Sequence, residues 1–184
     1  MRIIAGTARS MPLRALEGMD TRPTTDRIKE TLFNIIQNEV PGSRFLDLFS
    51  GSGAIALEAV SRGAREAVLV ENSRKAAKVI QQNIDFTKMG DRCTLKVMDA
   101  AAYIRCIPSD LHFDLIFMDP PYGKGLEYEV LEALKDSPAV TEDTQIIVET
   151  DLSADPESFT MDGGFVLQRE KRYKTNRHVF LRKK

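Results

Sequence analysis

The sequence predicts an α/β fold of the Rossmann-like type, a mostly parallel sheet flanked by helices. Short apolar runs alternate with segments in which apolar residues recur at helical spacing, as in repeated strand–helix–strand units. A glycine turn, residues 50–53, follows the first of these runs, and Asp119–Tyr122 follows the fourth. Ligands of such sheets bind at the carboxyl ends of the strands, so both segments are expected at the functional edge.

The elements follow one another in a legible order. Residues 1–23 are expected to form an N-terminal arm with a small hairpin. A helix then starts after the capping side chains of residues 24–26 and continues to Val40, where Pro41 and Gly42 end it. Seven strands are expected, the last two as a terminal antiparallel pair, at residues 44–49, 67–70, 94–98, 113–118, 145–149, 165–169 and 178–182. The other helices are expected at residues 54–61, 73–89, 100–107 and 127–135.

Size and composition favour one domain, residues 1–184. A chain of 184 residues with 42% hydrophobic and 29% charged residues can bury a sizeable core in water. Apolar runs fall well short of the roughly 20 residues of a membrane span, and no signal segment opens the chain. A cytoplasmic protein is therefore expected, and we expect it to be a monomer. The few cysteines and histidines are too scattered for a metal site, so none is expected.

Charge is distributed unevenly along the chain. Residues 168–184 hold eight Lys or Arg against one Glu, whereas the whole chain has a formal net charge of −1. A basic tail on an acidic body is compatible with docking a phosphate backbone on one face, although charged tails are also often simply solvated. Six basic residues are the candidates for contacts with such a phosphate backbone, each of which is equally open to solvation or ion pairing: Arg22, Arg27, Lys171, Arg172, Lys174 and Arg177.

The glycine turn is followed by acids at the ends of the next two predicted strands. Gly51 and Gly53 lack a Cβ, so the backbone can turn tightly and approach a ligand closely. Glu71 ends the next strand, where a carboxylate can accept both hydroxyls of a ribose, and Asp99 ends the third, where it can meet an adenine edge. A Gly-x-Gly turn alone is a weak signal, but the turn with these two acids is considerably stronger.

The length of the chain and one further acidic residue indicate which nucleoside cofactor to expect. The turn also fits the dinucleotide pattern, but a nicotinamide enzyme would need a second nucleotide-binding half and a catalytic domain. Asp47, just before the turn, would repel a pyrophosphate and would suit a cationic aminoacyl sulfonium. S-adenosylmethionine is therefore the expected cofactor.

Asp119-Pro120-Pro121-Tyr122 has the properties of a pocket for a planar amino group. Two consecutive prolines fix two φ angles and remove two backbone donors, which leaves carbonyl and carboxylate acceptors beside one aromatic ring. This arrangement suits a nucleobase or an amide with an exposed NH2 group. A plain proline-rich turn is the ordinary alternative for Pro-Pro alone.

Together these residues resemble the class I methyltransferases. Asp47–Gly53 is similar to their motif I, Glu71 to their ribose-binding acid, Asp99 to their adenine contact, and Asp119–Tyr122 to the (D/N)PP(Y/F) motif of members that methylate amino groups. The resemblance implies that Asp119, Pro120, Pro121 and Tyr122 are catalytic. It also implies a cofactor site of Asp47, Ser50, Gly51, Gly53, Glu71, Asn72, Asp99, Ala100 and Asp119.

A closer resemblance lies outside these motifs. Residues 21–34, TRPTTDRIKETLFN, are similar to the signature of bacterial 16S ribosomal RNA guanine-N2 methyltransferases of the RsmD type. Residues 2–6 and 169–173 extend the likeness over almost the whole chain. It implies the exocyclic N2 of one guanine in 16S rRNA as the methyl acceptor, in the small ribosomal subunit or its assembly intermediate. Residues 7–13 depart from the basic, glycine-containing segment usual in that family, so RNA contacts of the arm are not assigned there.

The mechanism expected from this resemblance relies on Asp119. If its carboxylate and the Pro120 carbonyl accept the two N–H bonds of the amino group, the nitrogen lone pair is directed at the methyl group, while Tyr122 stacks on an extruded base. Two kinds of alternative remain. One is another amino methyltransferase, acting on adenine N6 of DNA or RNA or on a protein glutamine. The other is a non-catalytic RNA-binding assembly factor with a vestigial cofactor pocket.

Overall fold

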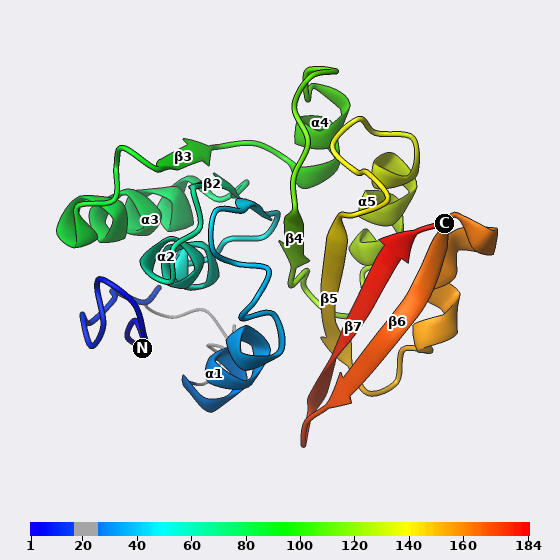
Figure 1. The fold of residues 1–184 in the computed structure, drawn as a ribbon, viewed down its shortest axis with the longest axis horizontal. Coiled ribbons are helices and arrows are strands. Elements are labelled where there is room, and N and C mark those ends of the chain that lie inside the picture. Colours follow the sequence, from blue (N-terminus) through cyan, green and yellow to red (C-terminus); the bar gives the residue numbers. More distant parts are fainter. Residues whose placement is uncertain (17–25) are drawn as a thin grey trace.

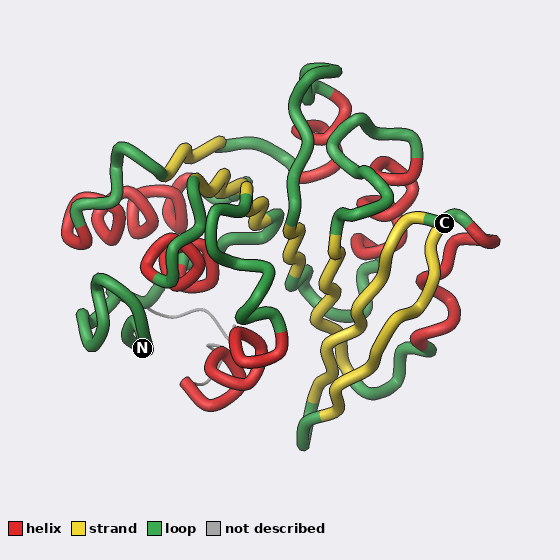
Figure 2. The backbone as a smooth tube through the Cα atoms, viewed as in Figure 1, coloured by secondary structure: helices red, strands yellow, loops and turns green. Residues whose placement is uncertain are grey.

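The computed structural model describes residues 1–16 and 26–184. One seven-stranded sheet, in the order β3-β2-β1-β4-β5-β7-β6, runs through it (Figures 1 and 2). Neighbours among β1 to β5 are parallel, and β7 is antiparallel to both β5 and β6. The mostly parallel sheet and its terminal antiparallel pair are therefore confirmed. The strands are Arg44–Asp47 (β1), Glu66–Val70 (β2), Cys93–Lys96 (β3), Leu115–Met118 (β4), Gln145–Asp151 (β5), Phe165–Arg172 (β6) and Asn176–Lys183 (β7).

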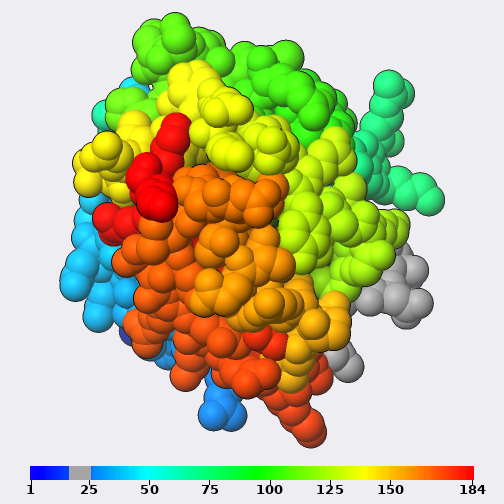
Figure 3. Space-filling model, turned by 90° about the vertical axis from the view of Figure 1, so that its right-hand side faces the viewer, coloured from blue at the N-terminus to red at the C-terminus, as the bar shows by residue number. Residues whose placement is uncertain are grey.

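Helices cover both faces of the sheet. Successive side chains of a strand point to opposite faces, so Phe45 belongs to one buried cluster and Leu46 to the other. Residues of the first three helices join the Phe45 cluster, and residues of the last three join the Leu46 cluster. Figure 3 shows η1 and β6, in orange, beside the yellow-green α5 at the surface. The helices are Asp26–Ile35 (α1), Ala54–Ser61 (α2), Arg74–Thr87 (α3), Ala100–Arg105 (α4), Leu126–Lys135 (α5) and the 3-10 helix Pro156–Gly163 (η1).

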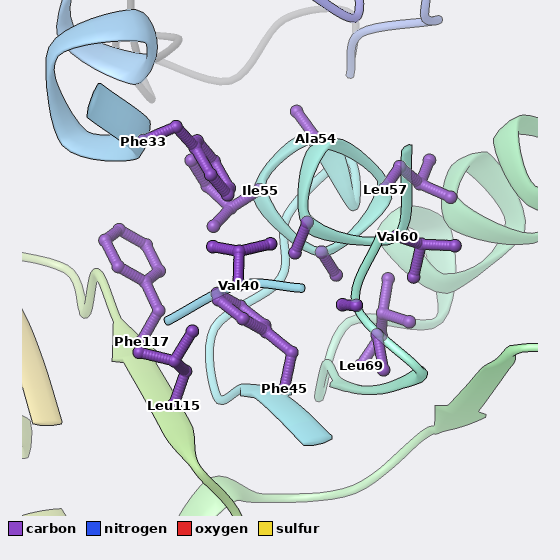
Figure 4. Close-up of a cluster of buried hydrophobic side chains, with 14 of the residues drawn as sticks. Phe33, Val40, Phe45, Ala54, Ile55, Leu57, Val60, Leu69, Leu115 and Phe117 are labelled. Atoms are coloured by element: carbon purple, nitrogen blue, oxygen red, sulfur yellow. The ribbon is translucent and has the colours of Figure 1, made fainter. Parts of the chain in front are cut away.

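The Phe45 cluster holds α1 and α2 on the sheet (Figure 4). Phe33 of α1 stacks on Phe45 with the ring centroids 6.5 Å apart. Every residue of α2 is buried, as expected for a short helix that is largely apolar all round. This packing fixes the start of α2, and with it the glycine turn, against the end of β1. None of the described helices is long and apolar enough to cross a membrane.

Two local predictions are corrected by the structure. The first helix ends at Ile35 and not at Val40, because residues 36–40 form turns that still bury Ile36 and Val40. The apolar spacing at these positions thus reflects burial without a continued helix. The second correction is η1, which sequence periodicity missed because its register is broken by left-handed φ angles at Met161 and Asp162. The predicted capping residues Thr24 and Thr25 lie outside the described residues.

The N-terminal arm folds back as a small loop and is fastened to α2. Ile3 N donates to Met11 O at 3.0 Å, and one antiparallel bridge joins Arg2 to Pro12. Gly6 is required where the arm crosses α2, because a Cβ there would lie 1.8 Å from Ser61 O and the φ angle is +85°. The arm is held by Glu58 of α2, a residue that no motif had indicated.

Candidate active site

The acids that the sequence singles out gather at the carboxyl edge of the parallel strands. Asp47 ends β1, Glu71 follows β2, and Asp119 follows β4. In Figure 1 the arrowheads of β4 and β5 point to the same edge as the turn that joins β6 to β7. A hollow at the opposite edge is lined by residues that precede or begin strands, such as Ser43 and Asp114, and by none of the predicted site residues.

Asp47 is a buried carboxyl group in an unusual electrostatic state. The residue is 1% exposed, and neither carboxylate oxygen has a hydrogen-bond partner among the described residues. Burial raises the pKa of Asp47 to about 7, and the charge of Glu71 adds to this. The backbone N–H groups of Ala56 and Phe49 and the Ser50 hydroxyl lie close enough to oppose the rise without meeting the geometry of a hydrogen bond, and the Ser50 hydroxyl donates to the Asp47 backbone carbonyl instead. A cation placed beside Asp47 would relieve the cost of ionising it.

The glycine turn is braced by Glu71. Gly51 N donates to Glu71 Oε2 at 2.9 Å, and Ser73 N donates to Glu71 Oε1 at 2.8 Å. Gly51 has a φ of +55° and open space where a Cβ would stand, so a ligand can approach its backbone closely. A carboxylate has about four lone-pair sites, so Glu71 keeps the capacity to accept further donors such as ribose hydroxyls.

Asp99, predicted at the end of the third strand, lies at the start of α4. The Asp99 carboxylate accepts a hydrogen bond from Ala102 N at 2.9 Å and thereby caps α4, whose first residue Ala100 is buried. One Asp99 oxygen is thus engaged in a structural contact that was not foreseen, and the carboxyl group stays exposed. Asn72 is also exposed at the end of β2.

The acceptor motif lies on the same sheet face as Asp47. Asp47 pairs in register with Phe117, and Asp119 lies two residues further along the chain, just beyond the end of β4, so alternation of side chains places it on the same face. Burial raises the pKa of Asp119 well above its usual range, and the negative charges of Glu149 and Asp47 raise it further. Asp47 and Asp119 therefore form a site where ionised carboxylates are costly without a positive ligand.

Tyr122 closes the acceptor motif as an accessible ring. It is 45% exposed, whereas Pro120 is buried. Burial of the rest of the side chain and the charges of Asp119, Glu149 and Asp151 raise the pKa of its phenol, and the Asn176 side chain opposes this rise. The phenol therefore stays neutral, and one face of the ring is available to a planar group. The following turn contains Gly123 and Gly125, with φ of +72° and +68°, around an exposed Lys124.

Comparison with known proteins identifies the family to which this chain belongs. The family model described as conserved hypothetical protein 95 matches residues 1–182. Ribosomal RNA small subunit methyltransferase D of Escherichia coli is 34% identical over 152 residues, covering 83% of this chain and 75% of the relative. YlbH of Bacillus subtilis is 33% identical over 175 residues, covering 94% of both. The chain belongs to this family. It is a methyltransferase.

The fold of this methyltransferase agrees with its sequence relatives. The solved structure of yhhF from Escherichia coli superposes with a TM-score of 0.86 at 31% identity, covering 100% of this chain and 98% of the other. The predicted class I methyltransferase fold is therefore confirmed. The strand ends described above are those on which the predicted cofactor and acceptor motifs of this enzyme lie.

The basic residues predicted to contact RNA fall into different surroundings. Arg27, Arg172 and Lys174 are exposed, and Lys171 is partly exposed. Arg22 lies outside the described residues. Arg177 does not fit its prediction, because its side chain is 5% exposed, pairs with Glu170 at 2.9 Å and donates to Leu152 O at 2.5 Å. Because Arg177 lies within β7, its side chain is buried in the fold. The basic residues around it in the sequence did not reveal this.

Sequence reasoning also missed a polar cluster behind the acceptor motif. Glu149 of β5 accepts from Asn176 Nδ2 at 2.5 Å and lies 2.9 Å from His178 Nε2. His178 Nδ1 in turn lies 3.0 Å from the Tyr173 hydroxyl. In the sequence, His178 is isolated from the other histidine and from both cysteines, so it gave no sign of this cluster. An acid within a predicted strand, beside a polar stretch of the partner strand, was the available signal.

Proposed function

We propose that this methyltransferase transfers a methyl group from S-adenosylmethionine to the exocyclic N2 of a guanine in 16S ribosomal RNA. The observation that carries the proposal is the placement of Asp119–Tyr122 after β4, beside Asp47 and on the same face of the sheet, in a chain of this family. The named Escherichia coli relative acts on RNA of the small ribosomal subunit. The substrate is accordingly the small subunit or an intermediate of its assembly.

The residues at the ends of β1 and β2 fit this cofactor. A methyl group on positively charged sulfur is a strong electrophile, and that is the chemistry S-adenosylmethionine supplies when bound. The buried Asp47 carboxylate, with both oxygens unpartnered among the described residues, suits the positive part of such a ligand. Glu71 would accept the ribose hydroxyls, and the open backbone of Gly51 would permit close approach. The remaining residues proposed for this site are Ser50, Gly53, Asn72, Asp99, Ala100 and Asp119.

Asp119 and Pro120 would orient the acceptor amine. The N2 lone pair of guanine is delocalised into the ring, so the nitrogen must become pyramidal to act as a nucleophile. Two acceptors, the Asp119 carboxylate and the Pro120 carbonyl, would hold its two N–H bonds, and the rigid Pro120-Pro121 backbone would keep these acceptors in place. Such alignment contributes about 7 to 11 kcal/mol in favourable cases. The negative charge of Asp119 would also stabilise the positive charge that develops on nitrogen.

Tyr122 would provide the platform for the extruded base. Single-stranded or flipped bases stack on aromatic rings, an interaction worth about 1 to 3 kcal/mol. The accessible ring and the neutral phenol of Tyr122 meet that requirement. Extrusion from the RNA would then bring the amino edge of the base to Asp119.

The basic end of the chain would supply docking to phosphates. Lys171, Arg172 and Lys174 lie at the β6–β7 turn, at the same edge as the acceptor motif. Arg27 and Arg22 are further candidates on the N-terminal side. Since release of counterions makes such contacts salt-dependent, RNA affinity should fall steeply as salt rises.

Transfer of tritiated methyl groups to small subunits from a strain lacking the corresponding enzyme tests the proposal. The subunits are incubated with the purified protein, and the rRNA is digested to nucleosides. Labelled N2-methylguanosine is the expected product. Labelled N6-methyladenosine would overturn the guanine assignment, and absence of calorimetric binding of S-adenosylmethionine would favour a non-catalytic assembly factor.

A further inference from the structure

A row of polar side chains continues the acceptor motif across the sheet. Met118, the last residue of β4, pairs with Val148 of β5, so the residues that follow them, Asp119 and Glu149, lie side by side on one face. Glu149 pairs in register with His178 of β7. Adjacent strands lie about 4.8 Å apart, so Asp119 at the end of β4, Glu149 of β5 and His178 of β7 form a row across neighbouring strands.

Hydrogen bonds fix the far part of this row in one arrangement. Each Glu149 oxygen has a partner, Asn176 Nδ2 at 2.5 Å and His178 Nε2 at 2.9 Å. His178 is fully buried, packs edge-on against Phe117 and Phe180, and lies 3.0 Å from the Tyr173 hydroxyl. A buried network whose members bond to one another holds its side chains more rigidly than isolated pairs do.

Asn176 connects the network to the acceptor motif. Its side chain lies near enough to Tyr122 to affect the pKa of the phenol, although burial and three negative charges dominate that pKa. The amide oxygen Oδ1 of Asn176 is buried and has no hydrogen-bond partner among the described residues. An unpaired buried acceptor is costly, so a neighbouring donor that reaches it gains stabilisation. The Tyr122 hydroxyl is such a donor.

A purely structural role predicts a different pattern. At the other end of the same strand pair, Gln145 of β5 donates to Leu181 O of β7 at 2.9 Å. That contact joins β5 to β7 just as Asn176 and Glu149 do, and it lies at the start of β5, away from the acceptor motif that follows β4. Gln145 is therefore a matched reference for what β5–β7 cohesion alone contributes.

We propose that Glu149, Asn176 and His178 are positioning residues of the methyl-acceptor site. Asn176 orients the Tyr122 ring for the target base, Glu149 fixes Asn176 and sets the negative field at Asp119, and His178 holds Glu149. Tyr173 ties this network to the β6–β7 turn that carries Lys171, Arg172 and Lys174. The inference rests on the proposed function for its substrate, but the positioning of Tyr122 is a property of the free protein.

Steady-state kinetics with small subunits compare Asn176→Ala with Gln145→Leu. Asn176→Ala should lower kcat by about tenfold to a hundredfold, the range for losing one hydrogen bond to a charged or preorganised group, with unchanged affinity for S-adenosylmethionine. Gln145→Leu should leave kcat near the wild-type value even where it lowers the melting temperature as much. Equal kcat losses in both variants, or no loss in Asn176→Ala, would overturn the proposal.

Glu149→Gln separates charge from hydrogen bonding. The groups facing Asp119 are Asp47 on β1, Glu149 on β5 with His178 behind it, and Tyr122 in its own motif. Because the Glu149 charge makes ionisation of Asp119 harder, Glu149→Gln should move the acid limb of the kcat profile to lower pH. An acid limb that stays in place would exclude the electrostatic part of the proposal.

Fluorotyrosine labelling distinguishes failure of this inference from failure of the proposed function, because it requires no RNA. The chain has four tyrosines, and Tyr122→Phe assigns the fluorine signal of Tyr122. Asn176→Ala should shift or broaden that signal, and Gln145→Leu should not. If both variants leave it unchanged, the positioning role is wrong whatever the substrate is. A shifted signal with no methyl transfer by the wild type would overturn the proposed function alone.

Discussion

Glu58 of α2 and Asp47 at the end of β1 are both buried carboxyl groups, and their surroundings are opposite. Glu58 accepts from the backbone N–H groups of Ile4 and Ala5 at 2.7 and 3.0 Å and pairs with Lys29 at 3.2 Å and Arg62 at 2.7 Å. Asp47 has no hydrogen-bond partner among the described residues, and burial raises its pKa to about 7. A compensated carboxylate of this kind holds the fold together, whereas an uncompensated one is destabilising until a ligand provides its partner.

The strand-end acids extend the contrast. Asp119 resembles Asp47, because burial and two negative neighbours raise its pKa. Glu149 is intermediate, since it is fully hydrogen-bonded but its partners are an amide and an imidazole. The difference teaches that burial of an acid does not by itself indicate function. The partners of the acid decide whether its removal weakens the fold or the chemistry.

The largest effect on folding is expected from Glu58→Ala. The change leaves Lys29 buried beside Arg62 without a negative partner, and it leaves the Ile4 and Ala5 N–H groups without acceptors. The free energy of unfolding should therefore fall by about 3 to 5 kcal/mol. Chemical denaturation followed by circular dichroism measures this loss. Adding Lys29→Met should restore part of it. A stability within about 0.5 kcal/mol of wild type would show that Glu58 and its partners do not hold the fold together.

Asp119→Ala should instead act on chemistry. It removes both an acceptor and a negative charge from the reacting nitrogen, so kcat should fall about a hundredfold to a thousandfold, equivalent to about 3 to 4 kcal/mol. The free energy of unfolding should stay unchanged or rise, because the charges of Glu149 and Asp47 no longer repel a third carboxylate. Single-turnover methylation and denaturation of the same preparation provide both values. Near-normal turnover would exclude the proposed role of Asp119.

Asp47→Asn tests the uncompensated acid through pH. The folded-state pKa of Asp47, about 7, lies above its model value of 3.8, so over that range the folded state keeps a proton that the unfolded state has lost. The contribution of Asp47 to wild-type stability should therefore fall as pH rises from about 4 to about 7, by on the order of 4 kcal/mol, and the variant should escape this loss. Denaturant titrations across this range measure the difference. Parallel pH curves would contradict the assignment.

The affinity for the cofactor provides a second test of the ionisation of Asp47. Above about pH 7, ionised Asp47 should favour S-adenosylmethionine, which is cationic at sulfur, over S-adenosylhomocysteine, which is neutral there. Calorimetry should show that this preference grows with pH in the wild type and disappears in Asp47→Asn. A preference independent of pH in both proteins would assign the cation contact to another residue.

The sequence predicted the two halves of the site unequally, for a physical reason. Asp47, Gly51, Glu71 and Asp119 stand at strand ends, where a short local string fixes both the element and the position of the side chain. Glu149 and His178 meet only through the antiparallel register of β5 with β7, with 29 positions of separation. Local patterns do not encode such a register.

The remaining misses have the same origin. Arg177 was read as a surface cation because its neighbours in sequence are basic, yet its contacts are Leu152 and Glu170 on other strands or loops. The end of α1 was placed too late because the buried turns of residues 36–40 imitate helical spacing. Composition and periodicity report burial well, and they do not report which distant residue is the partner.

The smallest effect is expected at Tyr122, where ring and hydroxyl can be separated. Tyr122→Ala removes the stacking face, so KM for the small subunit should rise about tenfold, whereas affinity for S-adenosylmethionine should hardly change. Tyr122→Phe keeps the face and loses only the group that can reach Asn176, so its KM should stay close to wild type and kcat should carry the loss. Stacking would then act in capture of the base, and the Asn176 contact in its alignment. Equal losses of RNA and cofactor affinity in Tyr122→Ala would show that the ring supports the whole strand edge. Tyr122 would then be a structural residue, as Glu58 is, and not a specific part of the acceptor site.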